Sequence, residues 1–461
     1  MPILSANNPL PILDCNAPEK SNTIEQLRYA CSLGALTSVL AIPRATPITH
    51  CGPGCASKQY QSLAGINGYQ GGEFYVPSTN ATENEVVFGG LPRLDELLES
   101  TFKIMDSDLY VILTGCIPEL VGDDVESLAN KYHGRGIPIV FAETGGFKGN
   151  NFTAHELVTR AIIDQFVGSY DGPRELGTVN VWSLLPFQNT FWRGDLGEIK
   201  RLLEGIGLKV NILFGPQSKG VAEWKEIPKA QFNLVLSPWL GLATAQHLEE
   251  KYGQPFLHVP VIPIGARQTS GFLRQVAAFA QINEQRVEDF IKQEEEIYYS
   301  YLRDFSTFYS GMTSQYNLPS MAVVVSESAY NLAITNFLVN QLGILPGRQI
   351  ITDDPPEEFR DAIRAEFRKL SADTPVEVDF EEDGYLIQQK IRQTDFTGQV
   401  PIVFGTTWEG ESAKELNAVL VEIGHPSTDE VVLSRSYIGY RGALSLLERT
   451  FTTVVRASTI G

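Results

Sequence analysis

A short run of strand-forming residues that ends in a glycine turn and a cysteine indicates how this chain folds. Leu109-Tyr110-Val111-Ile112-Leu113 is followed directly by Thr114-Gly115-Cys116. Such a run, bounded by a turn, is typical of a strand that is buried on both faces of a parallel sheet. Cys116 would then lie at the carboxyl end of the strand, which is the edge where α/β proteins place their functional groups.

The same pattern of strand, turn and helix recurs along the chain. Further strands are predicted at 137–142, 179–184, 210–214, 232–236, 321–325, 349–352, 376–380, 402–404 and 418–422. Helical periodicity follows several of them, at 196–206, 242–252 and 328–342. This alternation predicts an α/β protein of three doubly wound, Rossmann-like domains with mainly parallel sheets.

The domain boundaries follow from two connecting segments. A glycine-rich stretch at 167–178 separates an N-terminal α/β domain, residues 1–170, from a middle α/β domain, residues 171–312. A long polar helix is predicted at 281–309 and would end the middle domain. A C-terminal α/β domain then occupies residues 313–461.

Charge and composition exclude several classes of partner. The 461 residues include 36 Lys and Arg against 55 Asp and Glu, a formal net charge of −19. This charge argues against nucleic acid or an anionic membrane as the main partner. No apolar run reaches the roughly 18 residues of a membrane span, and the N-terminus lacks the features of a signal peptide. We therefore expect a cytoplasmic protein.

The cysteines are concentrated near the N-terminus. All five, Cys15, Cys31, Cys51, Cys55 and Cys116, lie in the first 116 residues of the chain. Independent placement would give this with a chance of about one in a thousand. Disulfides are rare in large cytosolic proteins, so metal or redox chemistry in the N-terminal domain is one explanation. Five buried and inert thiols are the other.

Three of the cysteines stand beside glycines in separate predicted turns. Cys31 precedes Ser32-Leu33-Gly34-Ala35, Cys55 ends the predicted loop 51–55, and Cys116 follows Gly115. Glycine lets backbone N–H groups approach the sulfides of an iron–sulfur cluster, which makes such a site plausible. Cys51 and Cys55 also have the spacing of a zinc half-site, although no second close pair follows. His50 is either a ligand or a hydrogen-bonded loop histidine.

These motifs occur in an order that resembles component 1 of nitrogenase and the nitrogenase-like oxidoreductases, over nearly the whole chain. The matching pieces are Cys31 with Leu33-Gly34-Ala35, His50-Cys51-Gly52-Pro53-Gly54-Cys55, Val87-Phe88-Gly89-Gly90, Thr114-Gly115-Cys116, Gly122-Asp123-Asp124-Val125, Gly145-Gly146-Phe147-Lys148-Gly149 and Tyr440-Arg441-Gly442-Ala443. The last of these is similar to the β-subunit side of the family.

The resemblance implies a role for three cysteines. Cys31, Cys55 and Cys116 match those that the family's subunits contribute to an iron–sulfur centre, a P-cluster or a simpler 4Fe-4S cluster, shared with a homologous α-type subunit in an α2β2 heterotetramer. Cys51 is a further candidate ligand. The implied activity is electron relay from an ATP-hydrolysing iron protein to a metal cofactor in the α partner, with no catalytic residue in this chain. No phosphate-binding loop or dinucleotide fingerprint occurs in the sequence.

The absence of later cysteines makes the chain resemble the β side. The family's α subunit holds its catalytic cofactor through a middle-domain cysteine and a C-terminal histidine, whereas the matching stretch 233–239 lacks cysteine. His425 is therefore interpreted as a structural loop histidine. Asn150 stands where the resemblance predicts a serine that joins the oxidised cluster.

Alternatives stay open at this point. The Asn150 departure is compatible with a scaffold subunit on which a nitrogenase-type cofactor is assembled. A zinc-stabilised or sugar-binding α/β protein with incidental cysteines is the interpretation from outside the family. Arg267 is a contact for a partner or cofactor, or a surface ion pair. The sequence does not identify the substrate.

Overall fold

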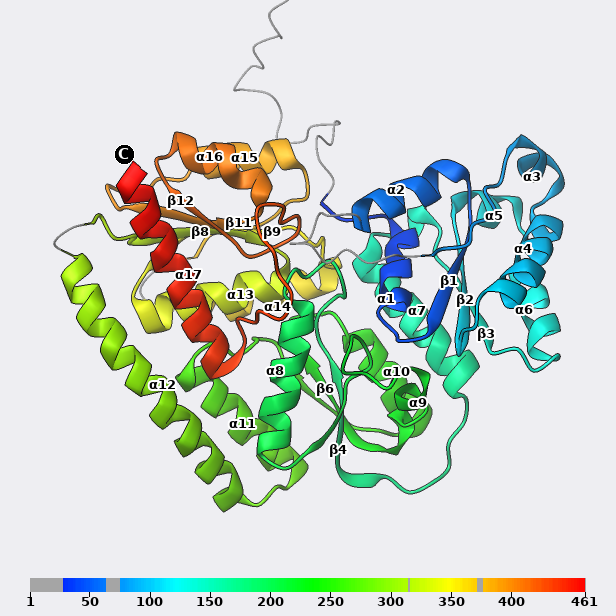
Figure 1. Cartoon of the computed structure of the whole chain (residues 1–461), viewed down its shortest axis with the longest axis horizontal. Helices are drawn as coiled ribbons and strands as arrows, with labels where there is room; N and C mark the ends of the chain where they lie inside the picture. Colours follow the sequence, from blue (N-terminus) through cyan, green and yellow to red (C-terminus); the bar gives the residue numbers. More distant parts are fainter. Residues whose placement is uncertain (1–27, 64–74, 314–315, 371–375, 461) are drawn as a thin grey trace, which may run out of the picture.

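Three β-sheets form the framework of the computed structural model, which describes residues 28–63, 75–313, 316–370 and 376–460. Every pair of neighbouring strands in these sheets is parallel. Each sheet is accompanied by helices, and the three units stand around a common centre (Figure 1). The predicted α/β fold with mainly parallel sheets is confirmed.

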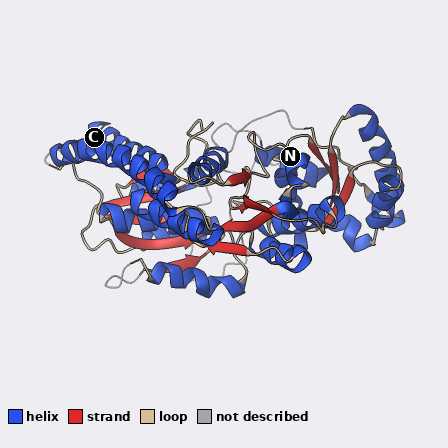
Figure 2. Cartoon of the chain, turned by 90° about the horizontal axis from the view of Figure 1, so that it is seen from below, coloured by secondary structure: helices blue, strands red, loops and turns tan. Residues whose placement is uncertain are grey.

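The N-terminal unit contains a sheet with the strand order β1-β2-β3. Its strands are β1 (Ala45–His50), β2 (Leu109–Thr114) and β3 (Ile139–Glu143). Its helices and turns are η1 (Ser32–Ala35), α1 (Leu36–Leu40), α2 (Pro53–Leu63), α3 (Glu83–Phe88), α4 (Leu91–Ile104), α5 (Cys116–Val121), α6 (Val125–His133), η2 (Gly146–Lys148), α7 (Asn151–Ile162) and η3 (Ile163–Val167). This unit and the C-terminal helix lie at opposite ends of the molecule (Figure 2).

The middle unit contains a sheet with the strand order β5-β4-β6-β7. Its strands are β4 (Glu175–Trp182), β5 (Lys209–Asn211), β6 (Ala230–Leu236) and β7 (Phe256–Val259). Its helices are α8 (Trp192–Gly205), α9 (Val221–Trp224), η4 (Ile227–Lys229), α10 (Leu242–Tyr252), α11 (Ala266–Ala280) and α12 (Glu284–Met312). The long helix predicted at 281–309 corresponds to α12, which begins after the N-cap Asn283.

The C-terminal unit contains a sheet with the strand order β10-β9-β8-β11-β12. Its strands are β8 (Met321–Ser326), β9 (Leu345–Ile351), β10 (Val378–Phe380), β11 (Pro401–Gly405) and β12 (Val419–Glu422). Its helices are α13 (Ser328–Phe337), η5 (Leu338–Leu342), α14 (Glu357–Arg368), α15 (Gly384–Arg392), η6 (Thr407–Glu409), α16 (Gly410–Glu415) and α17 (Gly439–Ile460). Helix α17 returns to the middle unit and contacts α8, α11 and α12.

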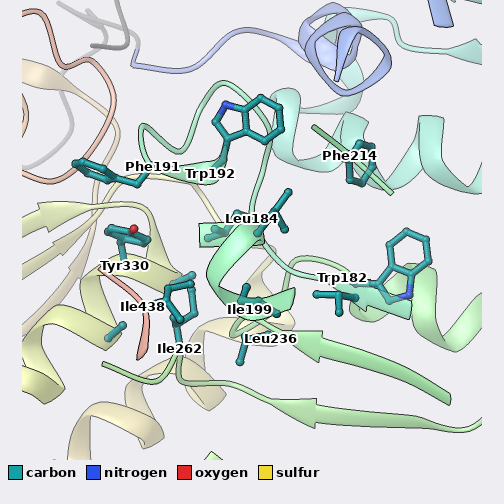
Figure 3. Close-up of a cluster of buried hydrophobic side chains, with 14 of the residues drawn as sticks. Trp182, Leu184, Phe191, Trp192, Ile199, Phe214, Leu236, Ile262, Tyr330 and Ile438 are labelled. Atoms are coloured by element: carbon teal, nitrogen blue, oxygen red, sulfur yellow. The ribbon is translucent and has the colours of Figure 1, made fainter. Parts of the chain in front are cut away.

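The main hydrophobic core crosses from the middle unit into the C-terminal unit. Trp182 and Ile199 of the middle unit belong to the same buried cluster as Tyr330 of α13 and Ile438, which directly precedes α17 (Figure 3). Burial of these large side chains makes the largest favourable contribution to holding the units together. Among the described residues, no helix is long and apolar enough to cross a membrane.

Candidate metal centre

Each of the three predicted ligand cysteines lies at the start of a helix or helical turn. Cys116 is the first residue of α5, directly after β2. Cys31 is the N-cap of η1, and Cys55 lies in the first turn of α2. The prediction that 51–55 is an irregular loop is wrong from Pro53 onward. Proline opens α2 because the first turn of a helix does not need the N–H that proline lacks.

The loop that carries Gly146 brings Cys116 and Cys31 together. A Cβ atom placed on Gly146 would lie 3.0 Å from the Cys116 Sγ and 3.6 Å from the Cys31 Sγ. The Gly146 N–H donates to the Cys116 Sγ over 3.1 Å. Burial, and after it the nearby Cys31 and Cys116 thiols, raises the pKa of the Cys55 thiol. The Cys31 and Cys116 thiols therefore meet at this glycine, and the Cys55 thiol is close enough to both to interact with them electrostatically.

Glu119 holds the glycine loop in place. Its Oε1 accepts hydrogen bonds from the Gly145 N–H over 2.6 Å and from the Thr114 hydroxyl over 2.5 Å. The Lys148 Nζ lies 2.9 Å from its Oε2. The sequence analysis missed Glu119. The available signal was its place three residues after Cys116, in the first turn of a helix that follows a strand.

Gln59 of α2 is a second residue that the sequence analysis missed. Its side chain is buried, and its Nε2 lies 3.9 Å from the Cys31 Sγ. Gln59 comes one helical turn after Cys55, so its position is visible only when Pro53–Leu63 is known to be helical.

Cys51 has a different environment. Cys51 is buried in the hydrophobic core, and its Sγ lies 3.7 Å from the Ser78 hydroxyl. Burial is the largest cause that raises the pKa of the Cys51 thiol. Cys15 lies outside the described residues. Cys51 is therefore the most enclosed of the described cysteines, and the nearby Cys55 thiol also raises its pKa.

His50 is hydrogen-bonded through both ring nitrogens. Its Nε2 lies 3.0 Å from the Asp123 Oδ2, and its Nδ1 lies 3.1 Å from the Thr79 hydroxyl. A Cβ at Gly90 would lie 2.6 Å from the His50 ring, so only glycine fits there. The imidazole has no free nitrogen for a metal, and burial lowers its pKa. Of the two interpretations of His50, the structure agrees with the hydrogen-bonded histidine and not with the metal ligand.

Asn150 lies beside Cys31 but directs its amide elsewhere. The two residues form a β-bridge. The Asn150 Oδ1 caps α7 by accepting from the Phe152 and Thr153 N–H groups, and its Nδ2 donates to the Asp353 carbonyl over 2.9 Å. Both polar atoms of the amide therefore make structural hydrogen bonds, to α7 and to Asp353.

His425 is packed inside the protein. This agrees with its interpretation from the sequence as a structural histidine. It is buried, and its ring stacks on Tyr29 at a centroid distance of 5.9 Å. Burial is the main cause that lowers the pKa of His425 to about 3, so the ring is neutral near pH 7.

Thiol groups as the candidate ligands fit an iron–sulfur centre better than they fit a single hard metal ion. Thiolates are the ligands of iron–sulfur clusters, and N–H groups beside the sulfur atoms stabilise the reduced charge. Within the described ranges, no group of three His, Cys, Asp or Glu side chains has the spacing that would hold one metal ion. A centre with several iron atoms spreads its ligands more widely, and here it would need further ligands from another chain.

Six large apolar side chains on three elements of the N-terminal unit are exposed. They lie on α5, which begins at Cys116, on α3, which contacts α5, and on η2, which contacts η1. They are Val86, Val87, Phe88, Leu120, Val121 and Phe147. Phe88 is 80% exposed and Leu120 is 75% exposed. Clusters of large exposed apolar side chains mark surfaces that bind other proteins.

Fold and site together define a class: an α/β protein of three parallel sheets with a thiol-lined site beside an apolar face of its N-terminal unit. The sequence pattern of the family described as nitrogenase component 1 type oxidoreductase matches residues 31–455, so the chain belongs to this family of oxidoreductases. Within the family it is β-like, which confirms the resemblance drawn from the motifs.

Relatives and solved structures agree with this assignment. The β chain of the nitrogenase vanadium-iron protein from Trichormus variabilis is 21% identical, and the alignment covers 94% of each chain. One of the subunits of the light-independent protochlorophyllide reductase from Angiopteris evecta is 27% identical over 52% of this chain and 48% of its own length. A solved structure titled "Nitrogenase Cp1 at pH 6.5" has a TM-score of 0.78 at 21% identity, covering 95% of this chain and 94% of its own, which shows the shared fold.

Proposed function

We propose that this chain is the β-type subunit of a nitrogenase-like reductase and that Cys31, Cys55 and Cys116 bind a P-cluster-like iron–sulfur centre shared with a homologous α-type subunit. Such a centre would supply one-electron transfer between an ATP-dependent iron protein and a metal cofactor in the α partner. The observation that carries the proposal is that the Cys31 and Cys116 thiols meet at Gly146, with the Cys55 thiol close enough to both for them to raise its pKa. The four described cysteines are all free thiols, as expected in the reducing cytoplasm.

The surface beside the site supports a shared centre. Cys31 and Cys55 are themselves exposed. On α3, α5 and η2 of the same unit lies a set of exposed apolar side chains that we call the apolar patch: Val86, Val87, Phe88, Leu120, Val121 and Phe147. An exposed thiolate cluster would be open to oxidation unless another chain covered it. An α2β2 heterotetramer with the centre at the α/β interface would bury both the thiols and part of the apolar patch.

The residues of this chain would orient and insulate the centre. Glu119 fixes the Gly145–Gly146 backbone so that the Gly146 N–H points at the Cys116 sulfur. Gln59 places a side-chain N–H near the Cys31 sulfur. Hydrogen bonds to thiolates favour the more negative state and so raise the reduction potential.

The first experiment measures iron and acid-labile sulfide in anaerobically purified chain together with whatever subunit copurifies. Replacing Cys31, Cys55 or Cys116 with Ala should remove most of the iron, because each loses one thiolate ligand. Cys51→Ala is the matched control and should retain it. Iron-free wild-type protein, or full iron in all three variants, would contradict the proposal.

The Asn150 geometry favours a second candidate, a scaffold subunit for cofactor assembly. Because its amide is engaged with α7 and with the Asp353 carbonyl, it offers no oxygen ligand for an oxidised P-cluster. Three thiolates alone also suit half of a 4Fe-4S cluster shared with a partner. Turnover of a small reducible substrate by the purified complex, supplied with iron protein and ATP, would exclude the scaffold role.

A further inference from the structure

A polar cleft lies between the middle and C-terminal units, far in sequence from the cysteines. It begins where β7 ends and continues along α11 toward α14. One part has a volume of about 360 Å³ and the adjoining part about 590 Å³, and they share Val259, Val261, Gln275 and Lys369. Both volumes are in the range of small-molecule sites, and ligands of α/β proteins bind beyond the carboxyl ends of strands.

The charge of the cleft differs from that of the chain. The chain has a net charge of −19, yet the lining of the 360 Å³ part contains Arg267 and Lys369 and no acidic residue. In the adjoining part the one acidic residue is Glu366, whose Oε1 lies 2.6 Å from the Lys369 Nζ. The Arg267 side chain is exposed, and it makes no hydrogen bond or ion pair with any residue that the structure describes. A free guanidinium in such a setting attracts anions.

Side-chain amides line the same wall. The Gln341 Nε2 is fixed by the Ile264 carbonyl at 2.6 Å, and the Asn340 Nδ2 by the Asn336 Oδ1 at 2.7 Å. Gln268 accepts the Ile264 N–H through its Oε1. Its Nε2 is buried and has no hydrogen-bond partner among the described residues. A buried N–H group without a partner costs free energy that an additional acceptor would recover.

The rest of the lining is mainly apolar. Val259, Val261, Pro263 and Phe272 also line the 360 Å³ part. An apolar wall with few polar anchors is the usual composition of a site for an organic molecule rather than for an inorganic ion alone.

We propose that this cleft binds a small organic anion, with a carboxylate or phosphate group held by Arg267 and a short carbon skeleton packed against Val259 and Phe272. The anion oxygens accept from the guanidinium, and the amides beside it discriminate the rest of the molecule. This site is independent of the thiols, and its occupancy does not depend on iron.

The test is calorimetric titration of the full-length chain with inorganic phosphate and with succinate. Glycerol is the neutral control, and sodium chloride at the same ionic strength as the anion solutions is the salt control. Binding of either anion is expected, and Arg267→Gln should weaken it at least about tenfold, because a charged hydrogen bond is lost. Phosphate binding alone identifies a phosphate ligand, and succinate binding alone a carboxylate ligand.

The matched control is Arg274→Gln, on the same helix α11. Arg274 donates to Glu288 over 2.6 Å and does not line the cleft, so this variant should bind like wild type. The proposal is overturned if neither anion binds above the salt control, if Arg267→Gln binds as well as wild type, or if both variants weaken binding equally. Melting temperatures equal to that of wild type confirm that the variants are folded.

Discussion

Gly146 is the residue on which the geometry of the candidate metal centre depends. Its missing side chain leaves room for two sulfur atoms, and its N–H donates to one of them. A methyl group at this position would lie 3.0 Å from the Cys116 Sγ, closer than nearly all real contacts of a Cβ atom. The sulfur is on a short side chain at the start of α5 and has little freedom to move away.

Gly146→Ala should therefore lower the iron content of the purified protein while leaving it folded. The methyl group displaces the Cys116 or Cys31 sulfur, and the global fold does not depend on this loop. Iron assay and circular dichroism on the same sample measure the two effects.

Gly54→Ala provides the matched control for that experiment. Gly54 is in α2, next to Cys55, and a Cβ there meets nothing within 4 Å. Alanine in a helix is favoured over glycine by about 0.5–1 kcal/mol, so this variant should keep its iron and be slightly more stable. Equal iron content in the two variants would show that Gly146 has no special role.

At the residue scale the sequence indicated a set of three candidate cysteines but not the residues around them. Cys31, Cys55 and Cys116 could be selected because each stands beside a glycine turn and matches a family motif. Glu119 and Gln59 could not, since a glutamate and a glutamine on helices have many possible partners. Their partners, the Gly145 N–H and the Cys31 sulfur, are set by tertiary contacts.

At the scale of elements, Asn150 connects the first helix after the site to the C-terminal unit. Asn150→Ala removes the N-cap of α7 and the bond to the Asp353 carbonyl. Loss of a cap costs about 0.5–2 kcal/mol, so the free energy of unfolding should fall by about that amount. Iron content should stay near that of wild type, because the hydrogen bonds of the amide are made to α7 and to Asp353.

Asn150→Ser separates the two roles of this side chain. Serine also caps helices, so this variant should recover most of the lost stability in urea-induced unfolding followed by tryptophan fluorescence. If Asn150→Ala instead lost iron without losing stability, the side chain would be acting on the metal centre and our interpretation of its geometry would be wrong.

Elements with strong apolar patterns were predicted, and those formed mainly by context were missed. Ten predicted strands each overlap a strand of the structure, but β1 and β7 were not predicted. Strand β1 contains two polar threonines and Pro47, which do not predict a strand. It forms because it pairs with β2 along its whole length, from Ala45 opposite Leu109 to His50 opposite Thr114. Proline is tolerated because β1 is at the edge of its sheet. Strand β7 has only four residues and also lies at an edge.

At the scale of the whole molecule, two buried acidic residues, Glu327 and Asp353, join the three units. The Trp239 Nε1 of the middle unit donates to the Asp353 Oδ2 over 2.8 Å, and the Asn189 Nδ2 donates to the Glu327 Oε1 over 3.2 Å. The Asp353 carbonyl accepts from Asn150 of the N-terminal unit. These contacts connect residues more than 100 positions apart, so no local pattern in the sequence could indicate them.

The same junction predicts how stability depends on pH. Burial, and after it the neighbouring Asp353, raises the pKa of Glu327 to about 8, and burial raises the pKa of Asp195 to about 7. In the unfolded chain both groups titrate near pH 4. The folded state therefore holds more protons than the unfolded state up to about pH 8, and the free energy of unfolding falls as the pH rises.

The buried histidines limit the pH range in which the effect of the carboxyl groups on stability can be measured by itself. Burial lowers the pKa of His155 to about 4 and that of His425 to about 3, so these groups raise stability with pH, but only below the unfolded value of about 6.5. Between about pH 7.5 and 8 the histidines of the unfolded chain are mostly neutral, so the buried carboxyl groups dominate the slope. In urea unfolding experiments, stability should then fall by about 1.4 kcal/mol per pH unit for each group still protonated.

Glu327→Gln should make the free energy of unfolding depend less on pH, because the amide does not titrate. Only the slopes of the two proteins are compared, so a constant difference in stability does not matter. Glu99→Gln is the control. Hydrogen bonding to Arg135 lowers the pKa of Glu99, so this group is ionised in both states throughout the window and the slope should be unchanged. A wild-type stability that rises from pH 7.5 to 8 would mean that the carboxyl groups at the junction are already ionised in the folded protein. The three units would then have to be held together against that charge by the apolar core they share.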